Sequence, residues 1–164
     1  MGDVDVQVKL VNIFLDKDTG TPVVLLQDPL TSDVLPILIA PLEASLIAIE
    51  IEGKKPVRPL SHDLMLNMIN ELGYEVKSVC VTDLRDNIYH ALITLVSGSN
   101  TIEIDSRPSD AIALALRAGS PIFVKKKVFA LAMGIENMAH GADRETLREV
   151  LEDIEIDDVD GKIM

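Results

Sequence analysis

Charged side chains gather in the stretch E-I-D-S-R-P-S-D, residues 103–110 of this 164-residue chain. Strand alternation places Glu103 and Asp105 on one face of an expected strand. Arg107 and Asp110 follow at the start of an expected helix, where free amide groups and an arginine together form a natural anion site. An ion pair from Arg107 to Asp105 or Asp110 that only fixes the strand–helix corner explains the stretch equally well.

A second polar stretch, R-P-L-S-H-D-L at residues 58–64, opens another expected helix. Ser61 suits the N-cap and Asp63 is a favourable acid in the first turn, so capping alone accounts for both residues. His62 is not required by capping. A histidine beside an aspartate at a helix start suits an acid–base pair or part of a metal site.

A third stretch, T-D-L-R-D-N at residues 82–87, is typical of a hairpin turn in which Asp83 and Arg85 form a solvated edge. The sequence contains no G-x-x-x-x-G-K-[ST], H-E-x-x-H or G-x-S-x-G motif, and no G-x-G-x-x-G follows an expected strand. Nucleotide kinases, zincins, α/β-hydrolases and Rossmann enzymes therefore lack support.

The composition argues against a broad nucleic-acid-binding surface. The chain has 15 Lys and Arg against 27 Asp and Glu, a net charge of −12, which is opposite to the basic footprint of typical nucleic-acid binders. With 3% aromatic residues and no tryptophan, it cannot build a platform on which bases stack. Its single cysteine, Cys80, excludes disulfide frameworks and cysteine-rich zinc sites. No apolar run is long enough to span a bilayer, so we expect a soluble, cytoplasmic protein without membrane contact.

The pattern of the chain occurs twice. V-K-L-V-N-I at 8–13 corresponds to V-K-S-V-C-V at 76–81, and P-L-E-A-S-L-I-A-I-E at 41–50 corresponds to P-S-D-A-I-A-L-A-L-R at 108–117. Both segments of the second pair begin with proline and have an acid two residues later, as a helix start favours. The alternative is a chance similarity between apolar segments.

We therefore expect an α+β single domain built by internal duplication of a β-β-β-α unit, with a mostly antiparallel or mixed sheet. The first repeat covers about residues 4–58 and the second about 74–124. A linking helix at 61–72, with apolar residues at helical spacing, joins them. These elements make up a domain of residues 1–135, and residues 136–164 form an acidic, partly helical tail.

The C-terminal segment 141–164 holds nine acidic and three basic residues, which is half of the net negative charge. An apolar stripe on this segment is formed by Leu147, Val150, Leu151 and Ile154. A short helix with such a stripe is marginal alone in water, so it needs a surface on its own domain or on a second copy. We expect a homo-oligomer, most simply a dimer, that uses strand edges or residues 125–155.

Five stretches of the chain resemble the bifunctional nuclease (BFN) domain family. They are L-P-I-L-I-A-P-L-E-A at 35–44, R-P-L-S-H-D-L at 58–64, T-D-L-R-D at 82–86, D-S-R-P-S-D-A-I-A-L-A-L-R at 105–117 and P-I-F-V at 121–124. The fourth is the most specific, and the resemblance covers about residues 6–135. It implies nuclease activity on DNA and RNA, as assigned to plant members, with nucleic acid as the partner.

As a nuclease, the protein would need a metal ion or a general base to activate water beside a phosphate. The candidate catalytic residues are Asp105, Asp110, Arg107, His62 and Asp63. The candidate substrate-binding residues are Arg107, Ser109 and Arg85. The candidate metal ligands are Glu43, Asp63, Asp105 and Asp110, for Mg²⁺ or Mn²⁺. Such a cation would reconcile acidic side chains with a polyanionic substrate.

The repeats place their helix starts symmetrically, and the linking helix begins between them. We therefore predict that the candidate residues converge in one cleft. They are Glu43, His62, Asp63, Asp105, Arg107 and Asp110. The alternative hypothesis is a non-catalytic module in which the same corner binds a small anion or a partner protein, and the net charge of −12 favours it.

Overall fold

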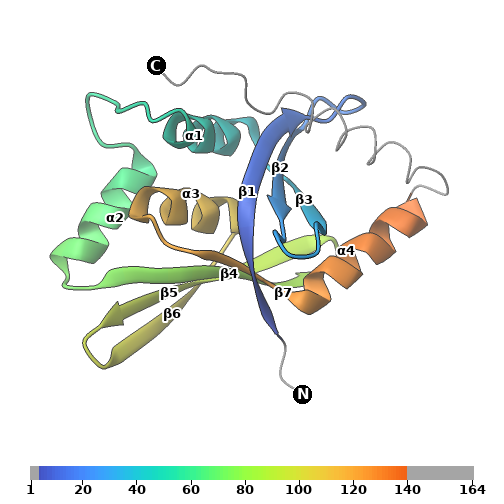
Figure 1. Ribbon diagram of the computed structural model, residues 1–164. Coiled ribbons are helices and arrows are strands. Elements are labelled where there is room, and N and C mark those ends of the chain that lie inside the picture. Colours follow the sequence, from blue (N-terminus) through green and yellow to red (C-terminus); the bar gives the residue numbers. More distant parts are fainter. Residues whose placement is uncertain (1–3, 140–164) are drawn as a thin grey trace. The chain divides into compact units, whose positions relative to one another are not determined.

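The computed structural model describes residues 4–139 of the chain (Figure 1). The strands of this range form one mixed seven-stranded sheet in the order β3-β2-β1-β7-β4-β5-β6, which confirms the expected α+β class. The described residues up to Ala132 form a compact unit that contains the sheet. The apolar stripe predicted in the C-terminal tail lies outside the described residues. None of the described helices is long and apolar enough to cross a bilayer.

The elements follow one another in the order β-β-β-α, then α, then β-β-β-α, then β and α. Their bounds are β1 Asp5–Leu15, β2 Pro22–Gln27, β3 Val34–Leu38, α1 Pro41–Ile51, α2 Ser61–Glu71, β4 Glu75–Arg85, β5 Ile88–Ser97, β6 Asn100–Ser106, α3 Pro108–Ala118, β7 Ile122–Lys125 and α4 Lys126–Ala139. The β-β-β-α order thus occurs twice, as the sequence predicts. Descent from a duplicated unit stays a prediction.

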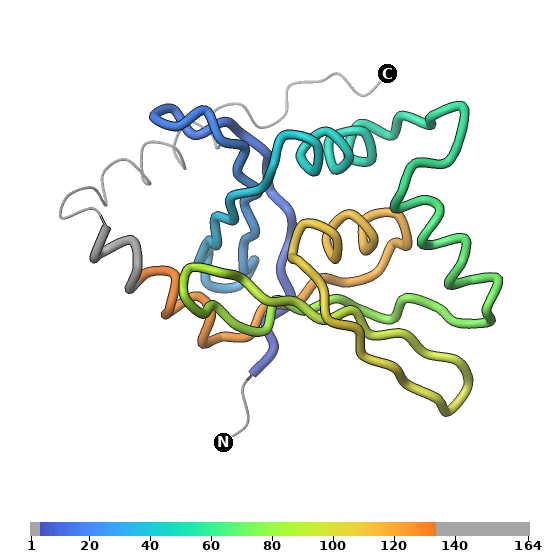
Figure 2. Tube along the Cα trace, turned by 180° about the vertical axis from the view of Figure 1, so that it is seen from behind, coloured from blue at the N-terminus to red at the C-terminus, as the bar shows by residue number. Residues whose placement is uncertain are grey.

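The sheet consists of two antiparallel meanders that β7 joins, and the view from behind shows them as separate parts of the trace, β1 to β3 in blue and β4 to β6 in green and yellow (Figure 2). Strands β1, β2 and β3 pair in sequence order, as do β4, β5 and β6. Strand β7 lies between the meanders, antiparallel to β1 and parallel to β4. Each meander leads directly into a helix, so the strand ends determine where α1 and α3 begin.

Helices α1 and α3 begin where their sequences predict. Each has a proline in its first turn, Pro41 or Pro108, where the missing N–H breaks no hydrogen bond. Helix α3 ends at Gly119, whose φ of 66° is the left-handed conformation that closes a helix and that glycine adopts without strain. The prolines therefore determine the residue at which each helix begins. This in turn determines the place of the acid in each first turn.

Helix α3 is the most deeply buried helix of the described chain. Its buried residues are Pro108, Ser109, Ala111, Ile112, Ala113, Leu114 and Ala115. It contacts α1, α2, β4 and β5. The alanines have short side chains, so the neighbouring elements approach the α3 backbone closely. Buried aliphatic side chains of the strands complete the core, among them Val24, Leu26, Leu35, Val79 and Val124.

Helix α2 differs from the sequence prediction in two respects. Its N-cap is Leu60 rather than Ser61, and the Asp63 carboxylate takes over the capping role by accepting the Leu60 amide proton at 2.8 Å. Its one fully buried residue is His62. The apolar residues that stay exposed are Leu64, Met65, Met68 and Leu72. The helix was predicted correctly, but its apolar stripe is not the face that packs on the core.

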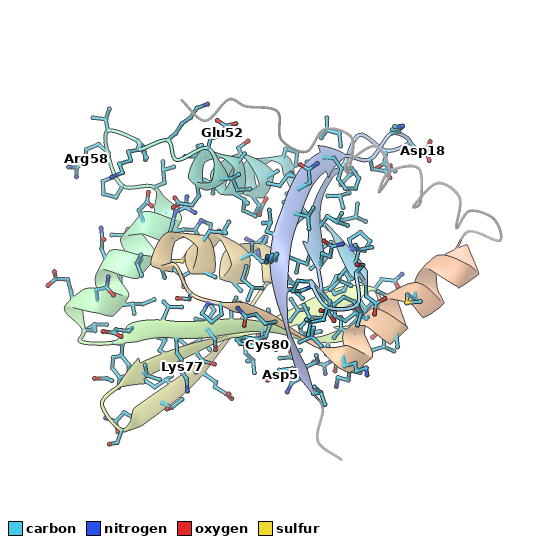
Figure 3. All side chains as sticks on the ribbon, viewed as in Figure 1. Asp5, Asp18, Glu52, Arg58, Lys77 and Cys80 are labelled. Carbon is cyan, nitrogen blue, oxygen red and sulfur yellow. The ribbon has the colours of Figure 1, made fainter. Side chains whose placement is uncertain are left out.

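Cys80 lies on β4, in register with Leu92 and Phe123 and near the labelled Asp5 (Figure 3). Burial, together with the negative charge of Asp5, raises the pKa of the Cys80 thiol to about 11. Because the thiolate is the reactive form, we expect iodoacetamide at pH 8 to alkylate the native chain on the order of 100-fold more slowly than the urea-unfolded chain. Mass spectrometry of timed samples measures both rates, and equal rates would contradict the prediction.

Candidate functional site

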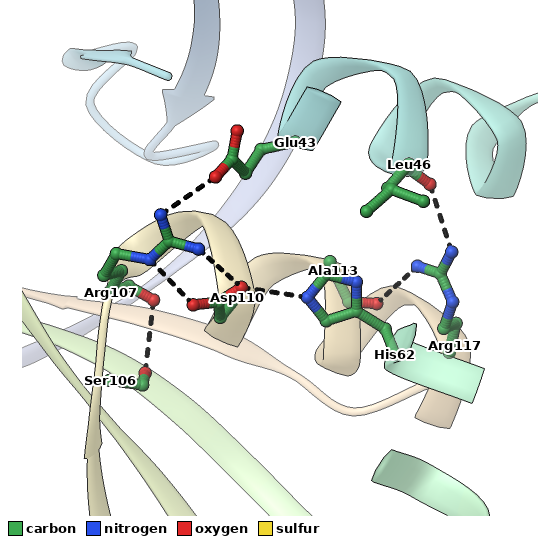
Figure 4. Close-up of polar contacts among 8 residues, drawn as sticks. All are labelled: Glu43, Leu46, His62, Ser106, Arg107, Asp110, Ala113 and Arg117. Atoms are coloured by element: carbon green, nitrogen blue, oxygen red, sulfur yellow. Dashed lines mark hydrogen bonds and ion pairs between the residues drawn. The ribbon is translucent and has the colours of Figure 1, made fainter. Parts of the chain in front are cut away.

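The starts of α1, α2 and α3 meet in the described structure (Figure 4). Glu43 and Asp110 lie in the first turns of α1 and α3, and His62 lies in the first turn of α2. Arg107 is the N-cap residue of α3. Hydrogen bonds connect these four residues, which we call the helix-start cluster. Helix starts stabilise negative charge, so two carboxylates can lie close together here.

The Arg107 guanidinium lies between the two carboxylates. Its Nε and Nη2 donate to the two carboxylate oxygens of Asp110 at 2.9 and 3.2 Å, and its Nη1 donates to Glu43 Oε1 at 2.9 Å. The hydrogen bonds to Asp110 and then to Glu43 raise the pKa of Arg107. A guanidinium has five N–H bonds, so one on Nη1 and one on Nη2 have no acceptor among the described residues. The side chain is 63% exposed, and these two donors can therefore meet a ligand.

Asp110 links the exposed arginine to a buried histidine. Its Oδ1 lies 3.0 Å from His62 Nε2, and the His62 side chain is 4% exposed. Burial opposes ionisation of Asp110, but the hydrogen bonds from Arg107 and His62 outweigh it and lower the pKa of the carboxyl. Asp110 is thus ionised at neutral pH, and His62 holds it in place from the protein side.

The lowered pKa of Asp110 predicts an acid-sensitive contribution to stability. A carboxyl with a depressed folded-state pKa stabilises the fold above its unfolded pKa of about 3.9, and this stabilisation is lost as the pH falls through the folded value. We expect the unfolding free-energy difference between wild type and Asp110→Asn to be largest near pH 7 and to shrink toward pH 2. Urea titrations at several pH values measure it. A difference that does not change with pH would contradict the prediction.

Glu43 provides an oxygen that has no partner. Its side chain is 14% exposed, Oε1 accepts from Arg107, and Oε2 is buried without a hydrogen bond among the described residues. Leaving a buried acceptor unsatisfied costs about 1–3 kcal/mol. A water molecule or a ligand hydroxyl that donated to Oε2 would recover part of that cost. Within the cluster, Glu43 is therefore the carboxylate that can accept a further hydrogen bond.

Asp63 belongs to a different group. Its Oδ1 accepts from Arg117 Nε at 2.8 Å, while its Oδ2 caps α2. Arg117 is 3% exposed and also donates to the backbone oxygens of Ala113 and Leu46, at 3.0 and 3.2 Å (Figure 4). Arg117, which lies on α3, thus forms hydrogen bonds with residues of both α1 and α2. The position of Asp63 is explained by this structural role, and the predicted cleft does not include it.

The remaining candidates lie outside the helix-start cluster. Asp105 is exposed on β6 opposite Leu92 and has no hydrogen bond to the four cluster residues. Its neighbour Ser106 lies opposite the buried Ala91, so Asp105 is on the sheet face that points away from α3. Ser109 is buried in α3, and Arg85 pairs with Asp83 at 3.3 Å at the end of β4. The structure thus joins four of the six residues that were expected to converge.

The predicted metal ligands do not gather at one point. They are Glu43, Asp63, Asp105 and Asp110. Between residues 4 and 139, no group of three or more His, Cys, Asp or Glu side chains is arranged to hold a metal ion. Asp63 is bound to Arg117, and the Arg107 guanidinium occupies the position between the other two inward-facing acids. The described structure therefore lacks the preformed four-carboxylate site, and the positive charge between Glu43 and Asp110 comes from arginine.

Sequence reasoning missed Arg117, although the internal correspondence contained a signal. The aligned segments pair Glu43 with Asp110 and Glu50 with Arg117. In the structure both pairs meet across α1 and α3: the first shares Arg107, and the second lies 4.0 Å apart. A charged residue at the end of the apolar run A-L-A-L-R, aligned with an opposite charge, would have indicated a buried ion pair.

The fold and the cluster define an α+β domain that presents an arginine held by two carboxylates at its helix starts. The bifunctional nuclease domain matches residues 24–136, which include the whole cluster, and the chain belongs to that family. An uncharacterized protein of Mycobacterium tuberculosis is 40% identical over 126 residues, which cover 77% of this chain and 75% of that protein.

Plant relatives carry a functional name. Bifunctional nuclease 1 of Arabidopsis thaliana is 32% identical over 107 residues, which cover 63% of this chain and 33% of that protein. Bifunctional nuclease 2 of Oryza sativa subsp. japonica is 33% identical over 108 residues, which cover 64% of this chain and 33% of that protein. The match thus spans about a third of the plant proteins.

Proposed function

We propose that this domain hydrolyses phosphodiester bonds in nucleic acid, in DNA, RNA or both, and that the helix-start cluster is the reaction site. One observation carries the proposal: Arg107 is 63% exposed, is fixed by Glu43 and Asp110, and has two N–H donors without an acceptor in the part of the chain that the structure describes. The names of the plant relatives support the same class of reaction.

Arg107 binds the scissile phosphate. Its two free N–H groups point from different nitrogens, which suits two non-bridging phosphate oxygens. Because Asp110 and Glu43 already fix the guanidinium, little reorganisation is needed as negative charge develops on those oxygens. A donor held in this way stabilises the transition state more than the ground state.

Glu43 acts as the general base. Its Oε2 accepts the proton of a water molecule, whose oxygen forms a bond to phosphorus while the bond to the leaving oxygen breaks. The leaving oxygen takes a proton from solvent. Asp110 is less suited to this role because its pKa is lowered and both of its oxygens accept hydrogen bonds. His62 and Asp110 are positioning residues for Arg107.

A divalent cation, Mg²⁺ or Mn²⁺, remains part of the proposal. The cluster has two carboxylates and one guanidinium, and the protein has a net charge of −12, so added positive charge would favour a phosphate. Glu43 Oε2 would be the ligand atom for such an ion, in place of its role as the base. When bound, the cation would supply charge neutralisation at the phosphate.

The test is cleavage of labelled single- and double-stranded DNA and RNA by homogeneous protein, with Mg²⁺, with Mn²⁺ and with EDTA. We expect Arg107→Gln to lose about 100-fold of the wild-type rate, in the range for a single oxyanion-stabilising donor. Arg58→Gln is the matched control, because Arg58 is exposed in the loop before α2 and should keep the wild-type rate.

Two results would overturn the proposed function. The first is the absence of cleavage by the wild type under every condition, which would favour the non-catalytic anion- or protein-binding module. The second is equal cleavage by wild type and Arg107→Gln, because that activity would come from another site or from a contaminating nuclease.

A further inference from the structure

Two rows of exposed apolar side chains, one on α2 and one on β6, lie at the same end of the described structure. On α2, the inward row is His62, Leu66 and Ile69, and an outer row of Met65, Met68 and Leu72 flanks it. On β6, Ile102 and Ile104 are in register with the buried Leu95 and Ile93 of β5, so they face the same side as the core. We call Met65, Met68, Leu72, Ile102 and Ile104 the α2–β6 face.

The α2–β6 face is exposed although its pattern is that of a core. Its five side chains are between 41% and 74% exposed. Strand β6 is an edge strand of the described sheet and pairs with β5 alone, so the polar backbone groups of its second edge are also free. Both views of the chain place α2 and the β5–β6 hairpin at the same end (Figures 1 and 2). The five side chains present on the order of 500 Å² of apolar surface, at the upper end for a monomer.

The chemistry of the α2–β6 face excludes two kinds of partner. It has no aromatic ring and no cation, so it offers nucleic acid neither stacking nor charge. The exposed acid Glu71 lies beside Leu72, and the net charge of −12 would repel both nucleic acid and an anionic membrane. An apolar protein surface is the partner that remains.

We infer that the α2–β6 face binds the same face of a second copy of this chain. A stable interface buries about 800 Å² on each partner, and slightly more than half of that area is apolar, which the five side chains match. A two-fold axis would place α2 of one copy on the edge strand β6 of the other.

The proposed dimer would also stabilise the elements that position the helix-start cluster. Helix α2 carries His62 in its first turn, and β6 leads into Arg107. Each element of the proposed interface is therefore connected to a cluster residue. Arg107 itself is not part of the α2–β6 face. Dimerisation through this face does not depend on the proposed nuclease activity.

Sedimentation equilibrium of the full chain, from about 1 to 100 μM, tests the inference. We expect a dimer for wild type and a dissociation constant at least 100-fold higher for Met68→Glu and for Ile104→Glu. Val57→Glu is the control, because Val57 is fully exposed in the loop before α2. Leu151→Glu tests the C-terminal stripe. Both control variants should remain dimeric, and the far-UV circular dichroism spectrum of Met68→Glu should match that of wild type, which shows that the variant folds.

Three results would overturn the inference: a monomeric wild type at 100 μM, a Met68→Glu variant that dimerises as tightly as wild type, or a dimer lost on Leu151→Glu and kept on Met68→Glu. A salt series gives a second reading. Because each copy has a net charge of −12 and the proposed contact is apolar, dimerisation should be unchanged or tighter at 0.5 M NaCl than at 0.1 M. Weakening by salt would contradict an apolar interface.

Discussion

Glu43→Gln is expected to reduce kcat for phosphodiester hydrolysis by about 10²–10⁴, the range for removal of a general base. Glutamine has the same shape, and its amide oxygen can still accept from Arg107 Nη1, which Glu43 Oε1 does at 2.9 Å in the wild type. Phosphate binding by Arg107 should persist, so KM should stay within about threefold. Steady-state kinetics on a short labelled oligonucleotide separate the two parameters.

Glu52→Gln is the matched control for Glu43→Gln. Glu52 is an exposed glutamate that follows α1 and pairs with Lys54, away from the cluster. It should keep the wild-type kcat. If Glu43→Gln raises KM and leaves kcat unchanged, Glu43 serves only to hold Arg107, and its assignment as the base is wrong.

Arg117→Met is expected to lower the free energy of unfolding by about 3 kcal/mol, which is the cost of removing one partner of a buried ion pair. Methionine retains the apolar stem but donates nothing to Asp63, Ala113 or Leu46. Asp63 would then be left partly buried beside an apolar side chain. We place the loss at the lower end of the usual range because Asp63 is 27% exposed and water can partly solvate it.

Urea unfolding of Arg117→Met and of Arg85→Met measures this difference. Arg85 is 63% exposed and pairs only loosely with Asp83, so its replacement should change the unfolding free energy by less than about 0.5 kcal/mol. A similarly small change for Arg117→Met would show that the three-helix contact does not depend on this arginine.

The sequence predicted those parts of the fold that local chemistry determines. Pro41, Pro108 and Gly119 set the ends of α1 and α3, since proline and glycine restrict the backbone in known ways. The internal correspondence placed Glu43 and Asp110 at equivalent helix starts, and the structure connects both to Arg107. Local sequence signals were sufficient to predict a residue's position where that position depends only on neighbouring residues of the same turn.

Partners that lie far apart in the sequence were not predictable in this way. Asp63 has the sequence signature of a helix cap, and it is one, but its second oxygen binds Arg117, 54 residues away. The stripe of α2 has helical spacing, yet periodicity does not tell which face meets the core, and the buried residue is His62. Both outcomes depend on how α2 packs against α3.

Arginine side-chain NMR tests the central claim most directly, because it observes Arg107 itself. The ¹⁵N-labelled Glu43→Gln variant, which should bind without efficient cleavage, is titrated with a phosphorothioate oligonucleotide. We expect the Nε–H resonance of Arg107 to shift and saturate, while those of Arg58 and Arg85 do not move. An Arg107 resonance that stays unchanged at a saturating oligonucleotide concentration would contradict the assignment of the helix-start cluster as the phosphate site.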